Sequence, residues 1–483
     1  EEVYNIAMEA MDLFSLVVIR SLPQADQQKC LEAFSGFGSL AAAAAFEAQK
    51  TPADALMLLE KGRDIIAGNR FDIRIDLTEL RSVDKDLAEE FEKLRAQLDP
   101  SGVHAYMMNT GRSGEPGIKD PSGRLLRANR KLEEVVNRIR SKKGFEGFLK
   151  RPSLEQMKNA AGKGSIVVIN IAEWRCDAII VRKDREVESI HLDRLTQEAI
   201  TQQLGDVPSY NECSRSLAIP LICRQVLSPA STPVESYPRV WWCSTGNASR
   251  LPLHAASSGR KPGFPRGNVM NRVVSSYTSS IKALIFSRRQ AALRLGRLIT
   301  GTMDMDIPGN SVGDTIAKLN VKIESDPYEA DLLDYFTIAS LPHSPPPPEK
   351  WPAIFHFAGH GVTNPTDPSK SCLYTRDSPL YVEELVRVGM YERFPLLAYL
   401  SACSTGVNVV NGKAGLGDEG IHVMGALQLA GFVGVMGALW RVSDDTAGRV
   451  AKVFYEQLLK GDWEEEDRMA RCFHYAVMSL RNT

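Results

Sequence analysis

The sequence has few cysteines, and none of them stand in the close pairs that bind metals or exchange disulfides. Eight cysteines are spread over 483 residues without one CxxC pair. This spacing disfavours a zinc ribbon and a disulfide-stapled scaffold. Because secreted domains that are stabilised by disulfides need paired cysteines, we expect a reducing, cytoplasmic setting. We also expect no cofactor.

Long apolar runs and an excess of charge are also absent. No run approaches the roughly 18 apolar residues that span a bilayer, and no signal peptide opens the chain, so we expect no membrane partner. The formal net charge of −1 gives no whole-chain field that would favour nucleic acid, and we expect no nucleic-acid partner. The chain opens with Glu1 rather than Met, and we expect it to be a fragment or a processed product.

The first part of the chain predicts helices. A chain of 483 residues exceeds the size at which one hydrophobic core stops growing, so we expect two or three domains. Thr51 followed by Pro52 is typical of a helix start, and Gly68 of a helix end. Another helix carries an apolar seam at helical spacing, formed by Leu125, Ala128, Leu132, Val135 and Ile139. No clean 34-residue period occurs, so degenerate tetratricopeptide-like repeats are the better interpretation.

The chain changes character at about residue 164, where apolar, β-rich runs begin to alternate with helical patterns. The runs cover 166–171, 178–181, 240–246, 353–361, 396–403 and 432–440, and the helical patterns cover 418–430 and 443–459. Strands that are apolar throughout and alternate with helices predict an α/β fold with a mainly parallel sheet covered on both faces. In such sheets the chemistry lies at the carboxyl ends of the strands.

Two histidines lie four residues apart in the run AIFHFAGHGV. In a strand this spacing spans roughly 13 Å, which is too far for both rings to bind one metal ion. Phe357 also stands where the metalloprotease pattern HExxH has Glu, so we expect no metal site. His356 lies within the predicted strand and is interpreted as a core or wall residue. His360 lies between Gly359 and Gly361, where the strand ends, so its imidazole can project into a cleft.

The stretch PLLAYLSACSTG places Cys403 directly after another apolar run. A cysteine there can be an inert buried thiol, and a lone histidine can equally be a core residue. Cysteine-dependent acyl transfer needs a thiolate, a base and an oxyanion hole. With both residues at strand ends, the sequence predicts Cys403 as the nucleophile and His360 as the base. The backbone N–H groups of Gly361 and Cys403 are the predicted oxyanion hole.

Several stretches resemble one known family. HFAGHG, LSACSTG and GLGDEGIHVMGALQLAGFVGVMGALWRVSDDTAGRVAKVFYEQLL resemble the CHAT peptidases, which are caspase-like domains often found after tetratricopeptide repeats. INIAEWRCDAIIV, VWWCSTGNASRLPLHAA and VVSSYTSS resemble earlier segments of this family, particularly in its fungal members. The resemblance covers roughly residues 160 to 480. Gly359 is a departure, because many CHAT members have Cys there, although separases also have Gly.

The resemblance implies a caspase- and separase-type α/β fold with a Cys–His dyad, in which His360 is the base and Cys403 the nucleophile. It implies a CHAT peptidase domain over residues 156–483, preceded by a helical, tetratricopeptide-like region over residues 1–155. The implied partners are a protein substrate and a regulatory protein that binds the helical region.

The segment LWRVSDD is similar to the LWDVTD stretch of separases, where an Asp lines the S1 pocket for a basic residue before the scissile bond. Asp444 matches that Asp, whereas Arg441 replaces another acid. The similarity implies Asp444 as the S1 residue. The other interpretation is that Asp444 and Asp445 form an N-terminal capping cluster for the following helix, and the two roles are compatible.

Two functions remain open at this point. The first is a cysteine endopeptidase that cleaves after a basic residue. The second is a catalytically idle caspase-like scaffold that recruits partners through its helical region. The presence of both His360 and Cys403 favours the peptidase.

Overall fold

The structure is a computed structural model, and it describes most of the chain. The residues outside the description are 18–21, 23, 99–120, 194, 206–236, 257–267, 300–320, 326–353, 365–366, 377, 388–394, 403–404, 407–417, 441, 461–466 and 482–483.

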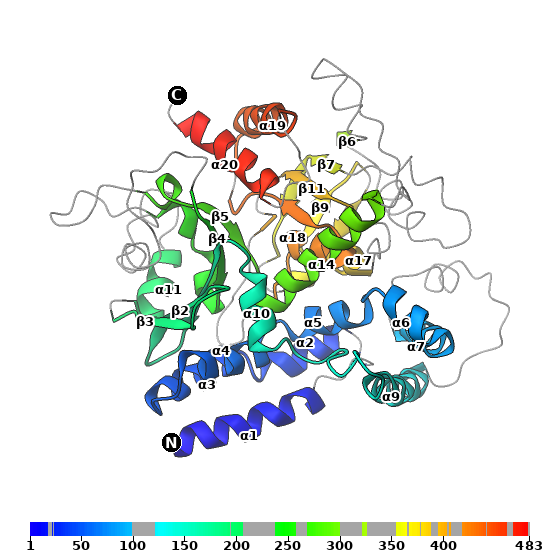
Figure 1. Cartoon of the computed structure of the whole chain (residues 1–483). Helices are drawn as coiled ribbons and strands as arrows, with labels where there is room; N and C mark the ends of the chain where they lie inside the picture. The colour runs from blue at the N-terminus through cyan, green and yellow to red at the C-terminus, as the bar shows by residue number, and fades with distance from the viewer. Residues whose placement is uncertain are drawn as a thin grey trace.

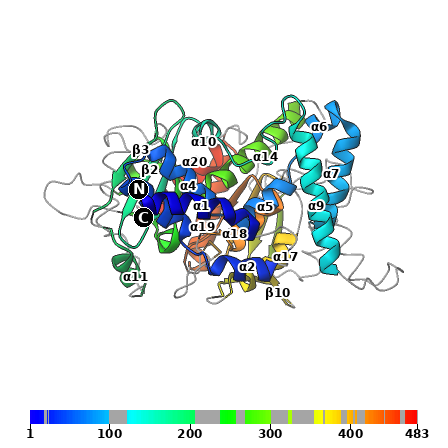
Figure 2. The same ribbon diagram turned by 90° about the horizontal axis from the view of Figure 1, so that it is seen from below.

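The N-terminal part of the chain is helical, as predicted. Its helices are α1 (Glu2–Val17), α2 (Gln24–Glu32), α3 (Phe37–Glu47), α4 (Pro52–Lys61), α5 (Ile65–Ile73), α6 (Thr78–Val83), α7 (Lys85–Leu98), α9 (Pro121–Arg140) and α10 (Leu154–Ala160). α7 and α9 lie side by side at one end of the molecule (Figure 2). They share a core cluster, in which Ala128, Leu132, Val135 and Ile139 are buried and Leu125 is partly buried. The predicted apolar seam is therefore confirmed.

The predicted start of α4 is confirmed, but its predicted end is wrong. The Thr51 hydroxyl accepts a hydrogen bond from the backbone of Asp54, and the Asp54 carboxylate accepts one from the backbone of Thr51. The helix is capped at its C-terminus by Gly62, and Gly68 lies inside α5. A Cβ atom on Gly62 would lie 2.6 Å from the Cα atom of Gly38 in α3. The close packing of α3 on α4, rather than a turn further along the chain, decides where the glycine is needed.

The first sheet is mixed and has the strand order β3-β2-β1-β4-β5. Its strands are β1 (Ser165–Ile171), β2 (Cys176–Val181), β3 (Glu188–His191), β4 (Arg239–Ser244) and β5 (Val274–Tyr277). β1, β4 and β5 are parallel, whereas β2 and β3 pair antiparallel. Successive residues of β1 enter different core clusters, with Ile166 in one and Val167 in the other, so both faces are buried. The helices α11 (Gln197–Gly205) and α14 (Ile281–Ile299) follow β3 and β5 along the chain.

The second sheet has the order β12-β11-β7-β6, and all its described pairs are parallel. Its strands are β6 (Val321–Ser325), β7 (Ile354–Ala358), β11 (Leu397–Ser401) and β12 (Gly434–Met436). Its neighbouring helices are α17 (Val382–Arg387), α18 (Val423–Ala430), α19 (Asp444–Leu458) and α20 (Arg468–Arg481). Phe355 and Phe357 pack in a cluster with residues of α17 and α18, whereas Ile354 and Tyr399 pack with residues of α19 and α20. A small antiparallel sheet is formed by β8 (His360–Val362), β9 (Cys372–Tyr374) and β10 (Pro379–Tyr381).

The structure has the predicted α/β content and parallel pairing, but it differs from the sequence prediction in two respects. The apolar runs form two sheets, one on each side of the molecule in Figure 1, instead of one. The helix predicted over 418–430 begins only at Val423, because Asp418–Gly420 form a turn with Gly420 at a φ of 59°. A positive φ is readily adopted by glycine and breaks the helix there.

The helical region shares its core with both sheets. Leu31, Ile66 and Phe71 belong to the cluster that packs on the second sheet, whereas Ala42 and Leu56 belong to a cluster of the first sheet. Among the described residues, no helix is both long and apolar enough to cross a membrane.

Candidate active site

The carboxyl ends of β7 and β11 meet at one edge of the second sheet. The strands are parallel neighbours, with Ala358 opposite Ser401. The pairing continues one residue further, because the Gly359 N–H donates a hydrogen bond to the Ser401 carbonyl at 3.3 Å. His360 and Cys403 each follow their paired residue by two positions. The prediction that these two strands end at the same edge is confirmed.

His360 lies just beyond this edge, as the first residue of β8. It is opposite Tyr374 of β9, and it is exposed to solvent. Gly359 is the corner between β7 and β8, where a Cβ atom would lie 2.9 Å from the ring of Phe357. Glycine therefore suits this corner, which carries the chain out of one sheet and leaves His360 accessible. Gly361, the predicted oxyanion donor, follows within β8.

Cys403 itself lies outside the described residues, and the structure fixes the chain on both sides of it. On one side, Ala402 is buried after β11. On the other side, the buried Thr405 accepts a hydrogen bond from the Ala438 N–H through its hydroxyl, at 3.2 Å. The Thr405 carbonyl accepts a second hydrogen bond from the Met424 N–H, also at 3.2 Å. A Cβ atom on Gly437 would lie 2.3 Å from the Thr405 hydroxyl, so this neighbour must be glycine.

His356 is a buried structural residue, as predicted. Its Nε2 atom lies 2.9 Å from the hydroxyl of Ser401, and its Nδ1 atom lies 3.1 Å from the hydroxyl of Tyr455. Its ring also packs against Tyr399, with 4.7 Å between ring centroids. Burial lowers the pKa of His356 to about 4, so the ring is neutral at physiological pH. The sequence did not reveal Ser401 and Tyr455 as its partners, because α19 lies nearly 100 residues away.

The other cysteines that the structure describes include several buried thiols. Burial raises the pKa of the Cys176 thiol to about 11 and that of Cys243 to about 12, and it also raises the pKa of Cys372. Such thiols are protonated at neutral pH, and a protonated thiol is a poor nucleophile. They are core residues.

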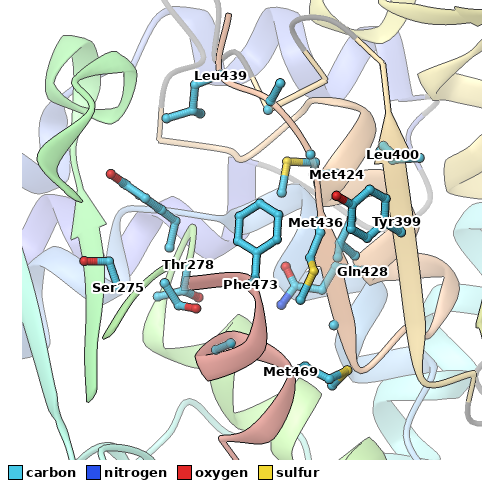
Figure 3. A pocket seen from close by; sticks show the side chains of 18 of the residues that line it. Ser275, Thr278, Tyr399, Leu400, Met424, Gln428, Met436, Leu439, Met469 and Phe473 are labelled. Atoms are coloured by element: carbon cyan, nitrogen blue, oxygen red, sulfur yellow. The ribbon is translucent and has the colours of Figure 1, made fainter. Parts of the chain in front are cut away.

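A cavity of about 910 Å³ lies between the two sheets and reaches the edge that carries His360. Gly359, Ser401 and Ala402 line it at that edge. Figure 3 shows its apolar interior, where side chains of β11, α18, β12 and α20 lie opposite residues near β5. The labelled members are Ser275, Thr278, Tyr399, Leu400, Met424, Gln428, Met436, Leu439, Met469 and Phe473. The sequence alone did not predict this cavity, because its walls come from both sheets.

The segments that follow β4 and β12 also meet in an aromatic contact at the wall of this cavity. The ring of His254 stacks on Trp440, with 5.9 Å between centroids and an interplanar angle of 12°. Its Nδ1 atom lies 2.7 Å from the hydroxyl of Tyr277 at the end of β5. All three residues line the cavity, so the cavity wall is shared between the first sheet and the segment before α19.

Asp444 is the first residue of α19, which begins where the sequence predicted a helix. The N-cap is Ser443, whose hydroxyl accepts a hydrogen bond from the Thr446 N–H at 3.3 Å. The helix therefore has its cap without Asp444. Val442, Thr446 and Ala447 line the cavity, which places this helix start beside it. Within the described residues, no group of three His, Cys, Asp or Glu side chains could hold a metal ion.

The sequence profile of the CHAT domain matches residues 215–482, which is more than half of the chain. CHAT domains are related to caspase-like cysteine peptidases. No curated protein gives a significant match. The matched range contains the second sheet, the small sheet with His360 and the strand before Cys403, and on this basis the chain belongs to the CHAT domain family.

Proposed function

We propose that the chain is a cysteine endopeptidase in which His360 is the base and Cys403 the nucleophile. One observation supports this assignment most strongly. The parallel register pairs Ala358 with Ser401, and His360 and Cys403 each stand two residues beyond that pair. Neighbouring strands that end together bring the residues after them to one edge of a sheet.

The proposed reaction is an acyl transfer to the Cys403 thiol. His360 takes the thiol proton, and the sulfur attacks the carbonyl carbon of the scissile peptide bond. The tetrahedral oxyanion accepts hydrogen bonds from the backbone N–H groups of Gly361 and Cys403. The imidazolium of His360 then protonates the leaving amine, which leaves a thioester. His360 next takes a proton from water, and the water oxygen attacks the thioester carbonyl. The C–S bond then breaks, the acid is released, and the imidazolium returns the proton to the Cys403 thiolate.

The proposed substrate is a protein segment with Arg or Lys before the scissile bond, and Asp444 is the proposed S1 residue. Its support is the position of Asp444 at the start of α19, beside the cavity, in a helix that Ser443 already caps. A carboxylate in a partly dry pocket favours a basic side chain and disfavours an acidic one.

The proposed organisation has a helical, tetratricopeptide-like region over residues 1–155 and a caspase-like peptidase domain over residues 156–483. In the proposed peptidase fold, helices cover the parallel sheet on both faces. Core clusters on each side of β7 and β11 support this arrangement. We also propose a cytoplasmic location, which the described free thiols support. A protein partner that binds the helical region is the proposed regulator.

The direct test is peptide cleavage by the parent protein and two variants. A peptide library should be cleaved by the parent, and cleavage should be lost in Cys403→Ala and in His360→Ala while the melting temperature stays unchanged. Cleavage by Cys403→Ala at the parent rate would overturn the proposal. A folded parent that cleaves nothing, alone or with extracts that contain candidate partners, would favour the idle scaffold.

A further inference from the structure

The corner between α4 and α5 is buried against Asp418–Gly420, the turn before α18. Arg63 and Asp64, at this corner, are 4% and 2% exposed. The Arg63 guanidinium donates a hydrogen bond to the carbonyl of Ser244, the last residue of β4, at 3.0 Å. The Asp64 N–H donates one to the Asp418 carbonyl at 2.9 Å. The helical region therefore contacts the first sheet and the turn before α18 through the same corner.

Asp64 adopts a backbone conformation that is uncommon in residues other than glycine. Its φ of 53° and ψ of 40° lie in the left-handed region, which costs a residue other than glycine on the order of 1 kcal/mol or more. Its carboxylate accepts hydrogen bonds from the hydroxyl of Ser280 at 2.5 Å and from that of Ser279 at 3.1 Å. These contacts hold the strained corner in place.

Each residue of the turn is held by contacts from elsewhere in the chain. The Glu419 carboxyl group is buried, and its Oε2 atom accepts a hydrogen bond from the Ile66 N–H at the start of α5, at 2.8 Å. The Asp418 carboxylate accepts one from the Gly246 N–H, also at 2.8 Å. A Cβ atom on Gly420 would lie 2.7 Å from the side chain of Ser279. The turn has no room to shift while the corner keeps this position.

The turn is connected to the nucleophile segment through the first turn of α18. A Cβ atom on Gly425 would lie 2.1 Å from the Gly420 carbonyl, so the two backbones are in close contact. The neighbouring Met424 N–H donates the hydrogen bond to the Thr405 carbonyl. Thr405 stands two residues after Cys403. A series of described contacts therefore leads from the α4–α5 corner to the segment that carries the proposed nucleophile.

The polar network at this corner is not saturated. Nη1 of Arg63 lies 3.8 Å from the Glu60 carboxylate, and among the described residues neither this atom nor Oδ1 of Asp64 has a hydrogen-bond partner. Unsatisfied buried polar atoms cost free energy, so such a corner is released more easily than a fully bonded one.

We propose that Asp64 and Glu419 are positioning residues, through which the helical region holds the turn before α18 and thereby the Thr405 side of Cys403. This inference rests on the proposed function, and it names the residues that couple the helical region to the active site. Movement of the α4–α5 corner, as on binding of a protein partner, releases the turn and changes the reactivity of Cys403.

The test uses paired variants in the full chain. Asp64→Ala and Glu419→Ala remove the carboxylates. Asp64→Asn keeps an acceptor oxygen and a residue that tolerates the left-handed region, and Glu419→Gln keeps the acceptor for the Ile66 N–H. Asp72→Ala is the matched control, because it also removes a carboxylate, and the ion pair of Asp72 with Lys282, at 2.7 Å, joins α5 to α14 instead of to the turn.

Two measurements report on positioning. The first is the alkylation rate of Cys403 by iodoacetamide, located by peptide mapping, and the second is hydrogen exchange of the Met424 N–H, which donates the hydrogen bond to the Thr405 carbonyl. In Asp64→Ala and Glu419→Ala we expect alkylation to change at least roughly tenfold, because small displacements of a reacting group have large effects on rate. Exchange of the Met424 N–H should be faster, because its hydrogen bond to the Thr405 carbonyl is loosened. The Asn and Gln variants should restore parental values for both measurements.

The control separates positioning from general destabilisation. Asp72→Ala should leave both readouts at the parental value even if it lowers the melting temperature. Equal changes in Asp72→Ala and Asp64→Ala, or parental values in both Asp64→Ala and Glu419→Ala, would overturn the inference. Alkylation and exchange do not require peptide cleavage. If the parent cleaves no peptide, the proposed function fails while the positioning role is still decided by these two readouts.

Discussion

The Nε2 atom of His356 lies 2.9 Å from the hydroxyl of Ser401, two residues before Cys403. Its other ring nitrogen lies beside the hydroxyl of Tyr455 in α19. The imidazole thus joins β7, β11 and α19 under the strand end that carries the proposed nucleophile. His360, by contrast, is exposed beyond the same edge. The two histidines of one sequence run therefore have different environments, and their substitutions should have different effects.

The first prediction concerns these two histidines. His356→Ala leaves the buried hydroxyl of Tyr455 and the half-buried hydroxyl of Ser401 without their partner and opens a cavity beside Tyr399, so it should lower the free energy of unfolding by about 2–4 kcal/mol. His360→Ala removes an exposed side chain and should change stability by less than about 0.5 kcal/mol. Urea unfolding measures both. Activity should be lost in His360→Ala although it is stable, and a stable but inactive His356→Ala protein would reverse the assignment.

The second prediction concerns acid. Burial lowers the pKa of His422 to about 4, and its Nδ1 atom accepts the hydrogen bond from the Gly425 N–H that caps α18. An unfolded histidine has a pKa of about 6.5, so between about pH 6.5 and 4 the unfolded chain binds more protons. The contribution of neutral His422 to the free energy of unfolding is therefore complete above pH 6.5. It is lost as the pH falls, by on the order of 1–3 kcal/mol.

Other groups also titrate in this range, so the measurement must isolate His422. Burial raises the pKa of Glu419 to about 8. The folded chain therefore binds this proton more readily than the unfolded chain, and Glu419 increases the free energy of unfolding as the pH falls, opposite to His422. His422→Asn keeps a capping acceptor that does not titrate. The decrease in urea midpoint from pH 7 to pH 5 should be smaller in His422→Asn than in the parent. The same pH dependence in both proteins would show that His422 is not held neutral.

The third prediction compares two glycines. A Cβ atom on Gly437 would overlap the Thr405 hydroxyl, so Gly437→Ala should destabilise the protein by about 1–3 kcal/mol and alter Cys403 alkylation. Gly448, inside α19, faces open space, because no neighbouring atom lies within 4 Å of the place that a Cβ atom would take. Gly448→Ala should stabilise the protein by about 0.5–1 kcal/mol. Thermal melting of both variants checks this prediction, and equal shifts of the two melting temperatures would contradict it.

The fourth prediction concerns specificity. A peptide library varied at the residue before the scissile bond should show a preference of the parent for Arg and Lys. Loss of the charge in Asp444→Asn should lower kcat/KM for these peptides. The expected loss of transition-state stabilisation is roughly 2–5 kcal/mol, as for other truncated charge pairs. A parent that prefers Asp, Met or Leu would contradict the S1 role. So would an Asp444→Asn protein with an unchanged profile.

Local sequence patterns predicted the elements of this fold well. The helix start at Thr51 and Pro52, the apolar seam of α9 and the apolar strands β7 and β11 depend on neighbouring residues, and all are present. The division of the strands into two sheets was not predictable in this way. It depends on which strands pair, and apolar runs of similar composition can pair with one another in many orders.

The sequence predicted those parts of the site that depend on local patterns, and it did not predict those that combine residues far apart in the chain. The strand ends before His360 and Cys403 were visible as a change from apolar to small residues. The partners of His356, the cavity and the α4–α5 corner each combine residues more than 40 positions apart. No sequence pattern marks Arg63 and Asp64, and only their burial against β4 and the turn before α18 distinguishes them.

The most direct measurement is covalent labelling by a peptide ketone electrophile with Arg at its reactive end, followed by peptide mapping of the modified cysteine. The labelled position identifies the nucleophile, and the rate in His360→Ala reports on the base. We predict that the parent is labelled at Cys403, that the label is lost in Cys403→Ala, and that His360→Ala reacts at least roughly a hundredfold more slowly. Labelling at another cysteine, or an equal rate in the parent and His360→Ala, would contradict the account.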